Sequence, residues 1–308
     1  MHRFEPAFKG IFPPMLTPVH NDGAFDDAAM RDFVDWLIAR GVHGLFPNGS
    51  TGEFTRFDLS TQKEIVKTVA GATEGRVPIF AGATQRSTRL TIETCHEYHD
   101  MGVSAAIIVS PIYFQTSQEG LRAYFGCIAE ASPLPIFLYN IPSLATEIQV
   151  ATVIDLAKAH PNIIGIKDSS GNVPNMMRMM AGLIDHRPDF AFFTGYDSLI
   201  ASMLSLGVAG GMVASANVIP EVMRKIFDTC VDGGDPRDAL TLQHRVSPLF
   251  DEMLSAPEFP EGFRMGLRSR DFDPGPALMP LTNQQGRDNA LAAESIQRKV
   301  LGFETLFS

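Results

Sequence analysis

Short apolar segments recur along this chain, and each is followed by a stretch with the periodicity of an amphipathic helix. Eight such segments occur at a spacing of roughly 30 residues. Strands that alternate with helices in this way pair in parallel through right-handed crossovers. Eight units are the number that closes a (β/α)8 TIM barrel, so an α/β barrel is the predicted fold. The predicted strands are 11–16, 44–47, 78–81, 105–109, 135–139, 163–167, 190–194 and 209–213.

Helix boundaries can be predicted from capping residues. Serine and aspartate accept hydrogen bonds from the free amides of a first helical turn, and glycine adopts the left-handed conformation that often ends a helix. The expected N-caps are Asp26, Asp58, Ser87 and Ser117, and the expected helix ends lie near Gly41, Gly71 and Gly102.

After the eighth strand–helix unit, the sequence predicts helices only. Residues 1–231 are predicted to form the barrel that carries the active site, and residues 232–308 a C-terminal helical subdomain. Helices are expected at 239–254, 262–270 and 287–301, with a proline-rich break at 273–276. An open doubly wound sheet is the alternative fold. A Gly-x-Gly-x-x-Gly sequence after the first strand would favour it, and the sequence has none there.

Composition narrows the classes of function. The chain has 308 residues, 45% of them hydrophobic, which is enough for a large core. Its formal net charge is −10 and it has no dense cluster of Lys or Arg, so nucleic-acid binding is not expected. The start of the chain lacks the apolar region of a signal peptide, and no run approaches membrane-spanning length. Three widely separated cysteines indicate a reducing compartment, so a cytoplasmic protein is expected.

Lysine 167 ends one of the predicted strands. In a barrel, strand ends surround the mouth of the active site. Burial disfavours the ammonium form of a lysine, and the neutral amine that remains can attack a carbonyl to form a Schiff base. A lysine whose stem packs on the core while its ammonium reaches water is the alternative interpretation.

Two further motifs fall at predicted strand ends. Gly49-Ser50-Thr51-Gly52-Glu53 combines consecutive amides with two hydroxyls, which suits a small carboxylate, although the same letters form ordinary tight turns. Tyr139 ends the strand one βα unit before Lys167, so both side chains should enter the mouth from neighbouring strands. A phenol there can move protons, and a core tyrosine bonded to backbone is the alternative.

In their order and spacing, these motifs resemble the dihydrodipicolinate synthase / N-acetylneuraminate lyase superfamily of pyruvate-dependent class I aldolases. The match rests on Gly-Ser-Thr-Gly-Glu, Tyr-Asn-Ile-Pro and Gly-Ile-Lys-Asp-Ser-Ser-Gly. The resemblance implies that Lys167 forms the imine with pyruvate and that Tyr139 shuttles protons. It implies that Ser50 and Thr51 bind the carboxylate, with Ser50 also relaying protons.

The same resemblance implies an assembly. Tyr113 resembles the tyrosine that family members insert into a neighbouring subunit's active site, so at least a dimer is expected. The family is usually a homotetramer built from two such dimers, and its partners are small keto acids and aldehydes. No cofactor is expected beyond the covalent imine, and no metal, because the imine acts as the electron sink that a Lewis acid would otherwise provide.

Several positions depart from well-known branches of the superfamily. The synthases carry an arginine where this chain has Leu144, and often the first of two tyrosines where it has Ile112. Sialic acid lyases follow Gly-Tyr-Asp with an acidic residue, and here that residue is Ser198. Their Ser-Thr-Tyr-Asn is replaced by residues 214–217, Ala-Ser-Ala-Asn.

These departures resemble the 2-keto-3-deoxy sugar acid aldolases more closely. We therefore expect a carbon–carbon lyase that releases pyruvate and an aldehyde from such an acid. Gly195, Asp197, Ser198 and Ser215 are the residues expected to bind the polyol chain. Dihydrodipicolinate synthase, N-acetylneuraminate lyase and a 2-keto-3-deoxy acid dehydratase that uses the same imine stay open as alternatives.

Two hypotheses of other classes remain. A metal-dependent class II aldolase on the same barrel would need His, Asp or Glu clustered at strand ends, whereas the eight histidines are scattered. A catalytically silent barrel would be expected to lack Lys167 or Tyr139, and both are present.

Overall fold

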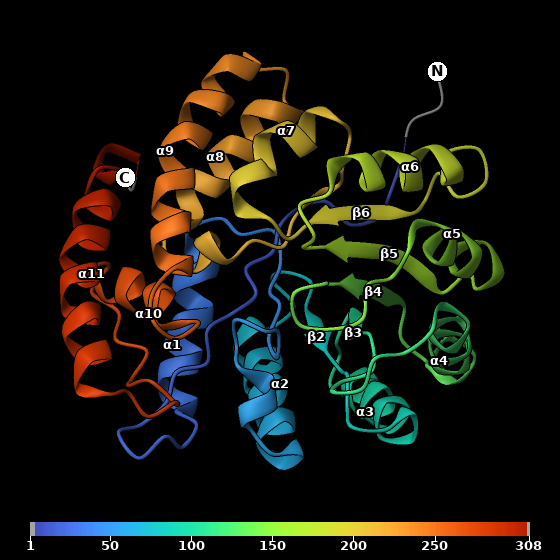
Figure 1. The fold of residues 1–308 in the computed structure, drawn as a ribbon, viewed down its shortest axis with the longest axis horizontal. Coiled ribbons are helices and arrows are strands. Elements are labelled where there is room, and N and C mark those ends of the chain that lie inside the picture. The colour runs from blue at the N-terminus through green and yellow to red at the C-terminus, as the bar shows by residue number, and fades with distance from the viewer. Residues whose placement is uncertain (1–3, 307–308) are drawn as a thin grey trace.

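Seven parallel strands form one curled sheet in the computed structural model, which describes residues 4–306 (Figure 1). The order is β1-β7-β6-β5-β4-β3-β2, so neighbours in sequence are neighbours in the sheet, apart from β1, which pairs with β7. The strands are β1 Gly10–Ile11, β2 Phe80–Gly82, β3 Ala105–Val109, β4 Ile136–Asn140, β5 Ile163–Asp168, β6 Ala191–Thr194 and β7 Gly210–Gly211.

The eighth predicted strand closes the ring. Segment 44–47 forms parallel bridges on both sides, from Phe46 to Pro14 and from Leu45 to Ile79. The Met15 amide donates to the Phe46 carbonyl at 2.8 Å, and the Phe80 amide donates to the Leu45 carbonyl at 2.9 Å. The predicted α/β barrel is therefore confirmed, with its second strand reduced to a pair of bridges.

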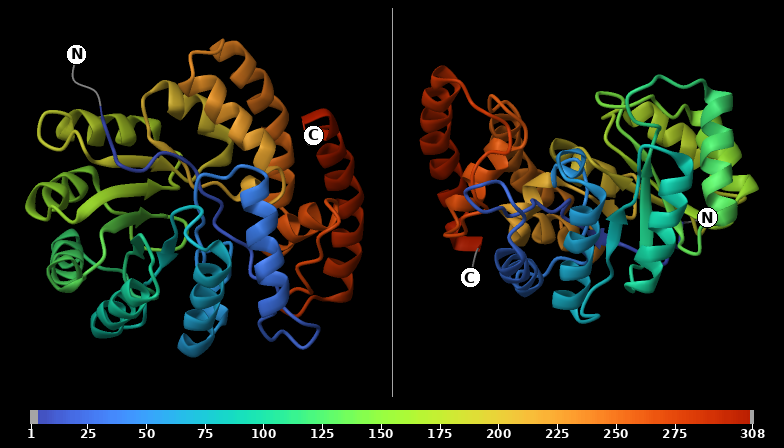
Figure 2. Two further views of the ribbon diagram at one scale, coloured as in Figure 1. Left: turned by 180° about the vertical axis from the view of Figure 1, so that it is seen from behind. Right: turned by 90° about the horizontal axis from the view of Figure 1, so that it is seen from below.

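Helices surround the strands, and further helices follow the barrel at one end of the molecule, beside α1 (Figures 1 and 2). Around the barrel lie α1 Asp27–Ala39, α2 Leu59–Thr73, α3 Thr88–Asp100, α4 Gln118–Ala131, α5 Val150–Ala159, α6 Val173–Leu183, α7 Ile200–Ser205 and α8 Pro220–Val231. The chain continues with α9 Pro236–Leu254, α10 Glu261–Arg268 and α11 Asn283–Leu301. Single 3-10 turns are η1 Phe54–Arg56, η2 Asp197–Leu199, η3 Ala214–Asn217 and η4 Glu304–Leu306.

The four predicted N-caps are confirmed, because each side chain accepts a hydrogen bond from the first turn of its helix. Gly41 and Gly102 follow their helices with φ of +79° and +81°, as expected. The predicted end at Gly71 is wrong. Helix α2 runs on to Thr73, because Glu74 and Gly75 take the left-handed conformation there.

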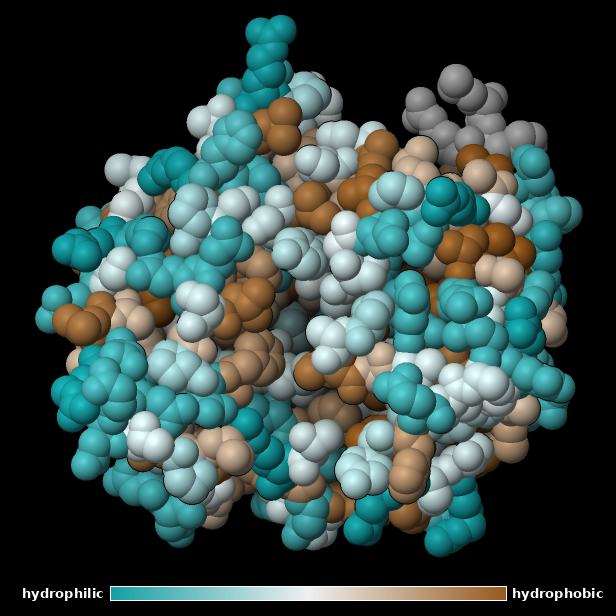
Figure 3. Space-filling model, viewed as in Figure 1, coloured by the Kyte–Doolittle hydropathy of each residue, from teal (hydrophilic) through white to brown (hydrophobic). Residues whose placement is uncertain are grey.

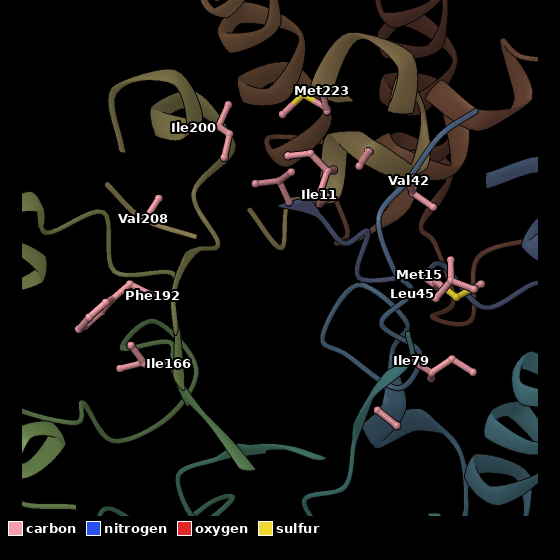
Figure 4. Close-up of a cluster of buried hydrophobic side chains, with 14 of the residues drawn as sticks. Ile11, Met15, Val42, Leu45, Ile79, Ile166, Phe192, Ile200, Val208 and Met223 are labelled. Carbon is pink, nitrogen blue, oxygen red and sulfur yellow. The ribbon is translucent and has the colours of Figure 1, made fainter. Parts of the chain in front are cut away.

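Alternating side chains divide the core into two parts. On β3, Ile108 packs outward against the helices, while Ile107 and Val109 point into the barrel. The outer cluster is the larger, and Figure 4 shows part of it, including Ile166 and Phe192 from neighbouring strands.

The inside of the barrel is filled by stacked rings. Phe12 lies on Phe80 with centroids 4.5 Å apart, Phe80 contacts Phe137 at 4.9 Å, and Phe137 contacts Phe193 at 5.7 Å. All four side chains are fully buried. This aromatic layer is a packed floor inside the strand ring.

The C-terminal helices start earlier than predicted. Helix α9 begins at Pro236, capped by Asp235, and α11 begins at Asn283 behind a capping box formed by Thr282 and Gln285. The cis bond that precedes Pro260 lies just before α10. The proposed division of the chain at residue 232 stays a prediction. Within residues 4–306, no helix is long and apolar enough to cross a membrane.

Candidate active site

Lys167 and Tyr139 lie side by side at the ends of β5 and β4. The two residues are direct partners in the parallel register, so their side chains leave the sheet on the same face. Lys167 Nζ lies 4.1 Å from the centroid of the Tyr139 ring and 4.9 Å from that of Phe46. Only 3% of Lys167 is exposed. The amine is therefore held between two aromatic rings and almost entirely removed from bulk water.

Ser50 lies on the other side of the tyrosine. Its Oγ is 3.4 Å from the Tyr139 hydroxyl, and either oxygen can donate this hydrogen bond. Ser50 belongs to the loop that follows the second strand segment, so three strand ends converge on one point. A chain of hydroxyl, phenol and amine results, and such a chain can move a proton over short steps.

The ionisation of Tyr139 is set by opposed effects. Burial by itself raises the pKa of the phenol, because the low-dielectric interior disfavours the phenolate. The charge of Lys167, together with hydrogen bonds to Ser50, Lys167 and Ser169, outweighs burial and lowers the pKa of Tyr139 below its ordinary value. Tyr139 is thus prepared to accept and release a proton.

The glycine-rich loop is tightly held. Thr17 Oγ1 donates to the Gly52 carbonyl at 2.8 Å, and a Cβ on Gly52 would come within 2.7 Å of the Met15 carbonyl oxygen. A Cβ on Gly49 would lie 3.1 Å from the Phe46 ring. Glycine is needed at residue 52 because the segment after β1 passes so close.

Asp197 is a buried carboxylate behind Lys167. Its oxygens accept hydrogen bonds from the Ser215 amide at 2.5 Å and the Ala214 amide at 3.2 Å. Only 1% of Asp197 is exposed, and burial raises its pKa to about 6, even though these bonds and the nearby Lys167 charge act in the opposite direction. The carboxylate therefore ties the turn after β6 to the turn after β7.

A cavity of about 330 Å³ opens above these groups. The space-filling view shows this face of the molecule hollowed near its centre (Figure 3). Its polar side chains are Ser50, Thr51, Tyr139, Ser143, Lys167, Ser169, Tyr196 and Asp197. The wall formed by the C-terminal part of the chain is apolar and consists of Phe250, Leu254, Phe259 and Phe263.

A second cavity, of about 400 Å³, adjoins the first. The two share Ser50, Ile141, Leu144 and Phe259 in their walls. The second is also lined by Ile112, which directly precedes Tyr113. Ser50 therefore lies in the wall between the two cavities and lines both.

The structure brings most of the sequence-predicted residues together, but not all. Lys167, Tyr139, Ser50, Thr51, Gly195 and Asp197 line the first cavity, and Gly49 lies beneath it against Phe46. Ser198 and Ser215 carry buried hydroxyls, and neither is among the residues that line this cavity. Tyr113 is 89% exposed, lies outside both cavities, and contacts Phe114 edge to face.

Sequence reasoning missed part of the lining. Ser143 follows Tyr-Asn-Ile-Pro directly and Ser169 follows Lys167-Asp168, so their position in the motifs could have suggested them. The phenylalanines of the C-terminal part of the chain belong to no motif that could have identified them as lining the cavity. Within residues 4–306, no group of three or more His, Cys, Asp or Glu side chains is arranged to hold a metal ion.

Comparisons with known proteins place this site in a family. The model of the dihydrodipicolinate synthetase family matches residues 7–298. A 4-hydroxy-tetrahydrodipicolinate synthase from Methanosphaerula palustris is 30% identical over 289 residues, which cover 93% of this chain and 98% of that protein. A probable 2-dehydro-3-deoxy-D-pentonate aldolase, YjhH of Escherichia coli, is 33% identical over 243 residues, covering 79% of this chain and 80% of the relative.

A solved structure agrees with the sequence matches. YagE, an Escherichia coli prophage protein of the dihydrodipicolinic acid synthase family crystallised with pyruvate, superimposes with a TM-score of 0.89 at 28% identity. The match covers 95% of this chain and 99% of YagE. The chain therefore belongs to the dihydrodipicolinate synthetase family and is one of its pyruvate-dependent class I aldolases and lyases.

Proposed function

We propose that Lys167 is the residue that forms the imine with pyruvate or with a 4-hydroxy-2-keto acid. The observation that carries this is the burial of its amine between Tyr139 and Phe46, at the floor of a cavity that opens to solvent. The amine adds to the keto carbon, and loss of water leaves a protonated imine. The imine then draws electrons from the bond between carbons three and four.

Tyr139 is proposed as the group that moves the proton. In cleavage, its phenolate takes the proton from the hydroxyl on carbon four as the bond to carbon three breaks. An aldehyde leaves, and an enamine of pyruvate stays on Lys167. Protonation of the enamine and addition of water then release pyruvate and the free lysine. Condensation reverses these steps, and the contact with Ser50 gives the phenol a partner for its proton in either direction.

The glycine-rich loop is proposed to bind the pyruvate carboxylate. Ser50 and Thr51 supply hydroxyls and amides at the edge of the cavity that is closest to Tyr139 and Lys167. A carboxylate bound there would keep the keto carbon within reach of the amine.

The proposed substrate class is a 2-keto-3-deoxy sugar acid without phosphate. Lys167 is the one cationic side chain that lines the first cavity in the described part of the chain, and Arg56 in the adjoining cavity is already paired with Glu53, so neither cavity offers a free cation to a second acidic group. Ser143, Ser169 and the carboxylate of Asp197 offer hydrogen bonds to hydroxyls. The similarity to YjhH supports this branch. Ser198 and Ser215 would contribute only if the surrounding turns opened.

Dihydrodipicolinate synthesis is the second candidate, favoured by the near full-length similarity to the Methanosphaerula synthase. Against it stands Leu144, 67% exposed at the cavity wall, where the synthases carry their carboxylate-binding arginine. The two candidates differ in the aldehyde. A sugar acid aldolase accepts uncharged hydroxyaldehydes, whereas the synthase requires aspartate semialdehyde.

We also propose a homo-oligomer, a dimer at least and a tetramer by family likeness. Tyr113 would enter the partner's second cavity, which borders Ser50. This would add a third hydroxyl to the pair formed by Ser50 and Tyr139. A cytoplasmic location is proposed with it.

Borohydride trapping with pyruvate tests the proposed chemistry. Intact mass should show one reduced pyruvate adduct per chain, peptide mapping should place it on Lys167, and Lys167→Ala should abolish it. A folded protein that gives no adduct in a large excess of pyruvate would refute the proposal. Condensation of pyruvate with glyceraldehyde, glycolaldehyde or aspartate semialdehyde, followed by mass analysis, then decides the substrate class.

A further inference from the structure

Arg264 is a fully buried cation in the middle of α10. Its guanidinium donates to Glu53 Oε2 at 2.5 Å, to the Thr17 carbonyl at 3.1 Å and to the Pro274 carbonyl at 2.9 Å. Glu261 Oε1 lies 3.3 Å from its Nε. The side chain of Arg264 is 0% exposed and that of Glu53 is 2% exposed. Two charges far apart in the sequence are thus buried together.

Glu53 is the last residue of the glycine-rich motif. Its φ of +55° lies in the left-handed region, which is unfavourable for a residue that carries a side chain. Its amide donates to the Ser50 carbonyl at 3.0 Å, and its second carboxylate oxygen pairs with Arg56. The unusual backbone of this residue is therefore held by ion pairs at both carboxylate oxygens.

Thr17 connects the same arginine to the middle of the loop. Its carbonyl accepts from Arg264, while its hydroxyl donates to the Gly52 carbonyl at 2.8 Å. Arg264 consequently reaches the loop by two routes, directly through Glu53 and through Thr17. The first route ends two residues after Thr51, and the second ends at the residue directly after it.

We propose that Glu53 and Arg264 are positioning residues for the Ser50–Thr51 carboxylate site, so that α10 is part of the active-site machinery. The inference rests on the proposed function of that loop. An arginine fork can hold a carboxylate and carbonyls in one fixed arrangement, which a flexible point charge cannot. Loss of the fork lets the loop relax and weakens carboxylate binding, while Lys167 and Tyr139 stay in place on β5 and β4.

The test needs a variant that leaves no unpaired buried charge. Removal of one partner from a buried ion pair strands the other, whereas removal of both leaves a neutral interior. The double variant Glu53→Gln/Arg264→Met removes both charges of the closest pair, and the buried Glu261, whose pKa burial already raises, can become neutral by taking up a proton. Arg270→Met is the matched control, because Arg270 pairs with Glu221 of α8 and Glu221 keeps its second ion pair, with Arg40.

The measurement is the rate of borohydride trapping against concentration, with pyruvate and, separately, with acetone, which lacks the carboxylate. For the double variant, we expect the half-saturating pyruvate concentration to rise at least tenfold, with little change in the acetone rate. Arg270→Met should match the wild type with both ketones. Arg264→Lys, which keeps the charge but not the fork, should fall between the wild type and the double variant.

Two results would overturn the inference. One is a folded double variant whose half-saturating pyruvate concentration stays within twofold of wild type. The other is an equal loss with pyruvate and acetone, which would mean general damage to the site. Where the double variant does not fold, Glu53→Gln alone decides by the same criterion, since Arg264 then keeps Glu261. A wild type that traps acetone but not pyruvate, or neither, would instead refute the proposed function.

Discussion

The phenol of Tyr139 is held between a cation and a hydroxyl. Lys167 lies over its ring and Ser50 contacts its oxygen. Because the pKa of this phenol is lowered, phenolate becomes available at a lower pH than for an ordinary tyrosine. The residue is thereby suited to accept a proton in cleavage at moderate pH.

Replacement of Tyr139 by Phe should separate imine formation from proton transfer. General acid–base catalysis contributes about 10²- to 10⁴-fold, so we expect kcat for cleavage to fall by that order. Borohydride should still trap pyruvate on Lys167. In the wild type, kcat/KM should rise with pH as the Tyr139 phenol loses its proton, and this rise should be absent from the variant. A variant with wild-type kcat, or with an unchanged pH profile, would remove Tyr139 from the mechanism.

Asp197 should make the protein less stable as the pH rises. Its pKa is raised from 3.8 to about 6 in the folded state, so the fold holds this proton more tightly than the unfolded chain. The stabilisation is complete below pH 3.8 and is lost as the pH passes about 6. A shift of about two units corresponds to about 3 kcal/mol.

Urea unfolding of Asp197→Asn and wild type between pH 4 and 7 measures this effect. The free energy of unfolding of the variant, relative to wild type, should increase with pH by a few kcal/mol at most. Asp189→Asn is the control, because Arg187 lowers the pKa of Asp189, so that its contribution is lost only below pH 3.8 and its difference from wild type should stay nearly constant between pH 4 and 7. Parallel curves for Asp197→Asn and wild type would contradict the expectation.

Residues at strand ends could be predicted from the sequence, and residues that act across the chain could not. Lys167 and Tyr139 end apolar runs, so barrel topology alone places them at the mouth. The contact of Glu53 with Arg264 joins positions 211 residues apart, and α10 has no pattern that marks its arginine as buried. Pairings of this kind depend on how a helix packs against the barrel. Hydrophobic periodicity predicts that a helix forms, but not where it packs.

Elements were predictable to the extent that local chemistry defines them. Five-residue strands such as β3 follow from β-branched runs, and N-caps follow from single side chains. Segment 44–47 forms only bridges, and β7 has only two residues. Glycines let the backbone approach closely at β7, where a Cβ on Gly210 would lie 1.9 Å from the Gly10 carbonyl oxygen. Composition cannot show such contacts in advance.

Gly165 shows how one element depends on its neighbours. It lies two residues before Lys167 on β5, and a Cβ there would lie 2.3 Å from the Phe137 ring and 2.5 Å from the Ala191 carbonyl oxygen. Gly165→Ala should therefore cost about 1–3 kcal/mol of unfolding free energy through overpacking. Since it displaces the strand that carries Lys167, it should also slow pyruvate trapping.

Gly286→Ala is the control for that substitution. Gly286 lies in α11 with nothing within 4 Å of the new Cβ, so alanine there should stabilise the protein by about 0.5–1 kcal/mol. Thermal unfolding measures both variants. Equal effects of the two substitutions would show that the β5 contacts are not restrictive.

At the scale of the whole molecule, several large apolar side chains are exposed together on the surface. Tyr113 and Phe114 are 89% and 75% exposed, and Tyr113 has a φ of +79°. Ile112 and Leu144, both lining the second cavity, are 38% and 67% exposed. A contiguous apolar patch of this kind is typical of an interaction site. The patch lies beside the second cavity, which Ser50 also lines. This position fits a dimer in which each subunit contributes Tyr113 to the active site of the other.

Mixing two impaired variants tests whether Tyr113 acts in the partner. Lys167→Ala lacks the amine, and Tyr113→Phe lacks the hydroxyl that the partner would receive. If Tyr113 acts across the interface, a mixed dimer has one site with both groups intact and one with neither. After subunit exchange at equal amounts, half of the dimers are mixed, so about a quarter of all sites should regain wild-type activity. Activity equal to the average of the two parent proteins would mean that Tyr113 does not act in trans. A mixture of the two variants without subunit exchange measures this average directly, and Lys167→Ala should add no activity to it. The activity gained on subunit exchange therefore reports how far each active site depends on its neighbour.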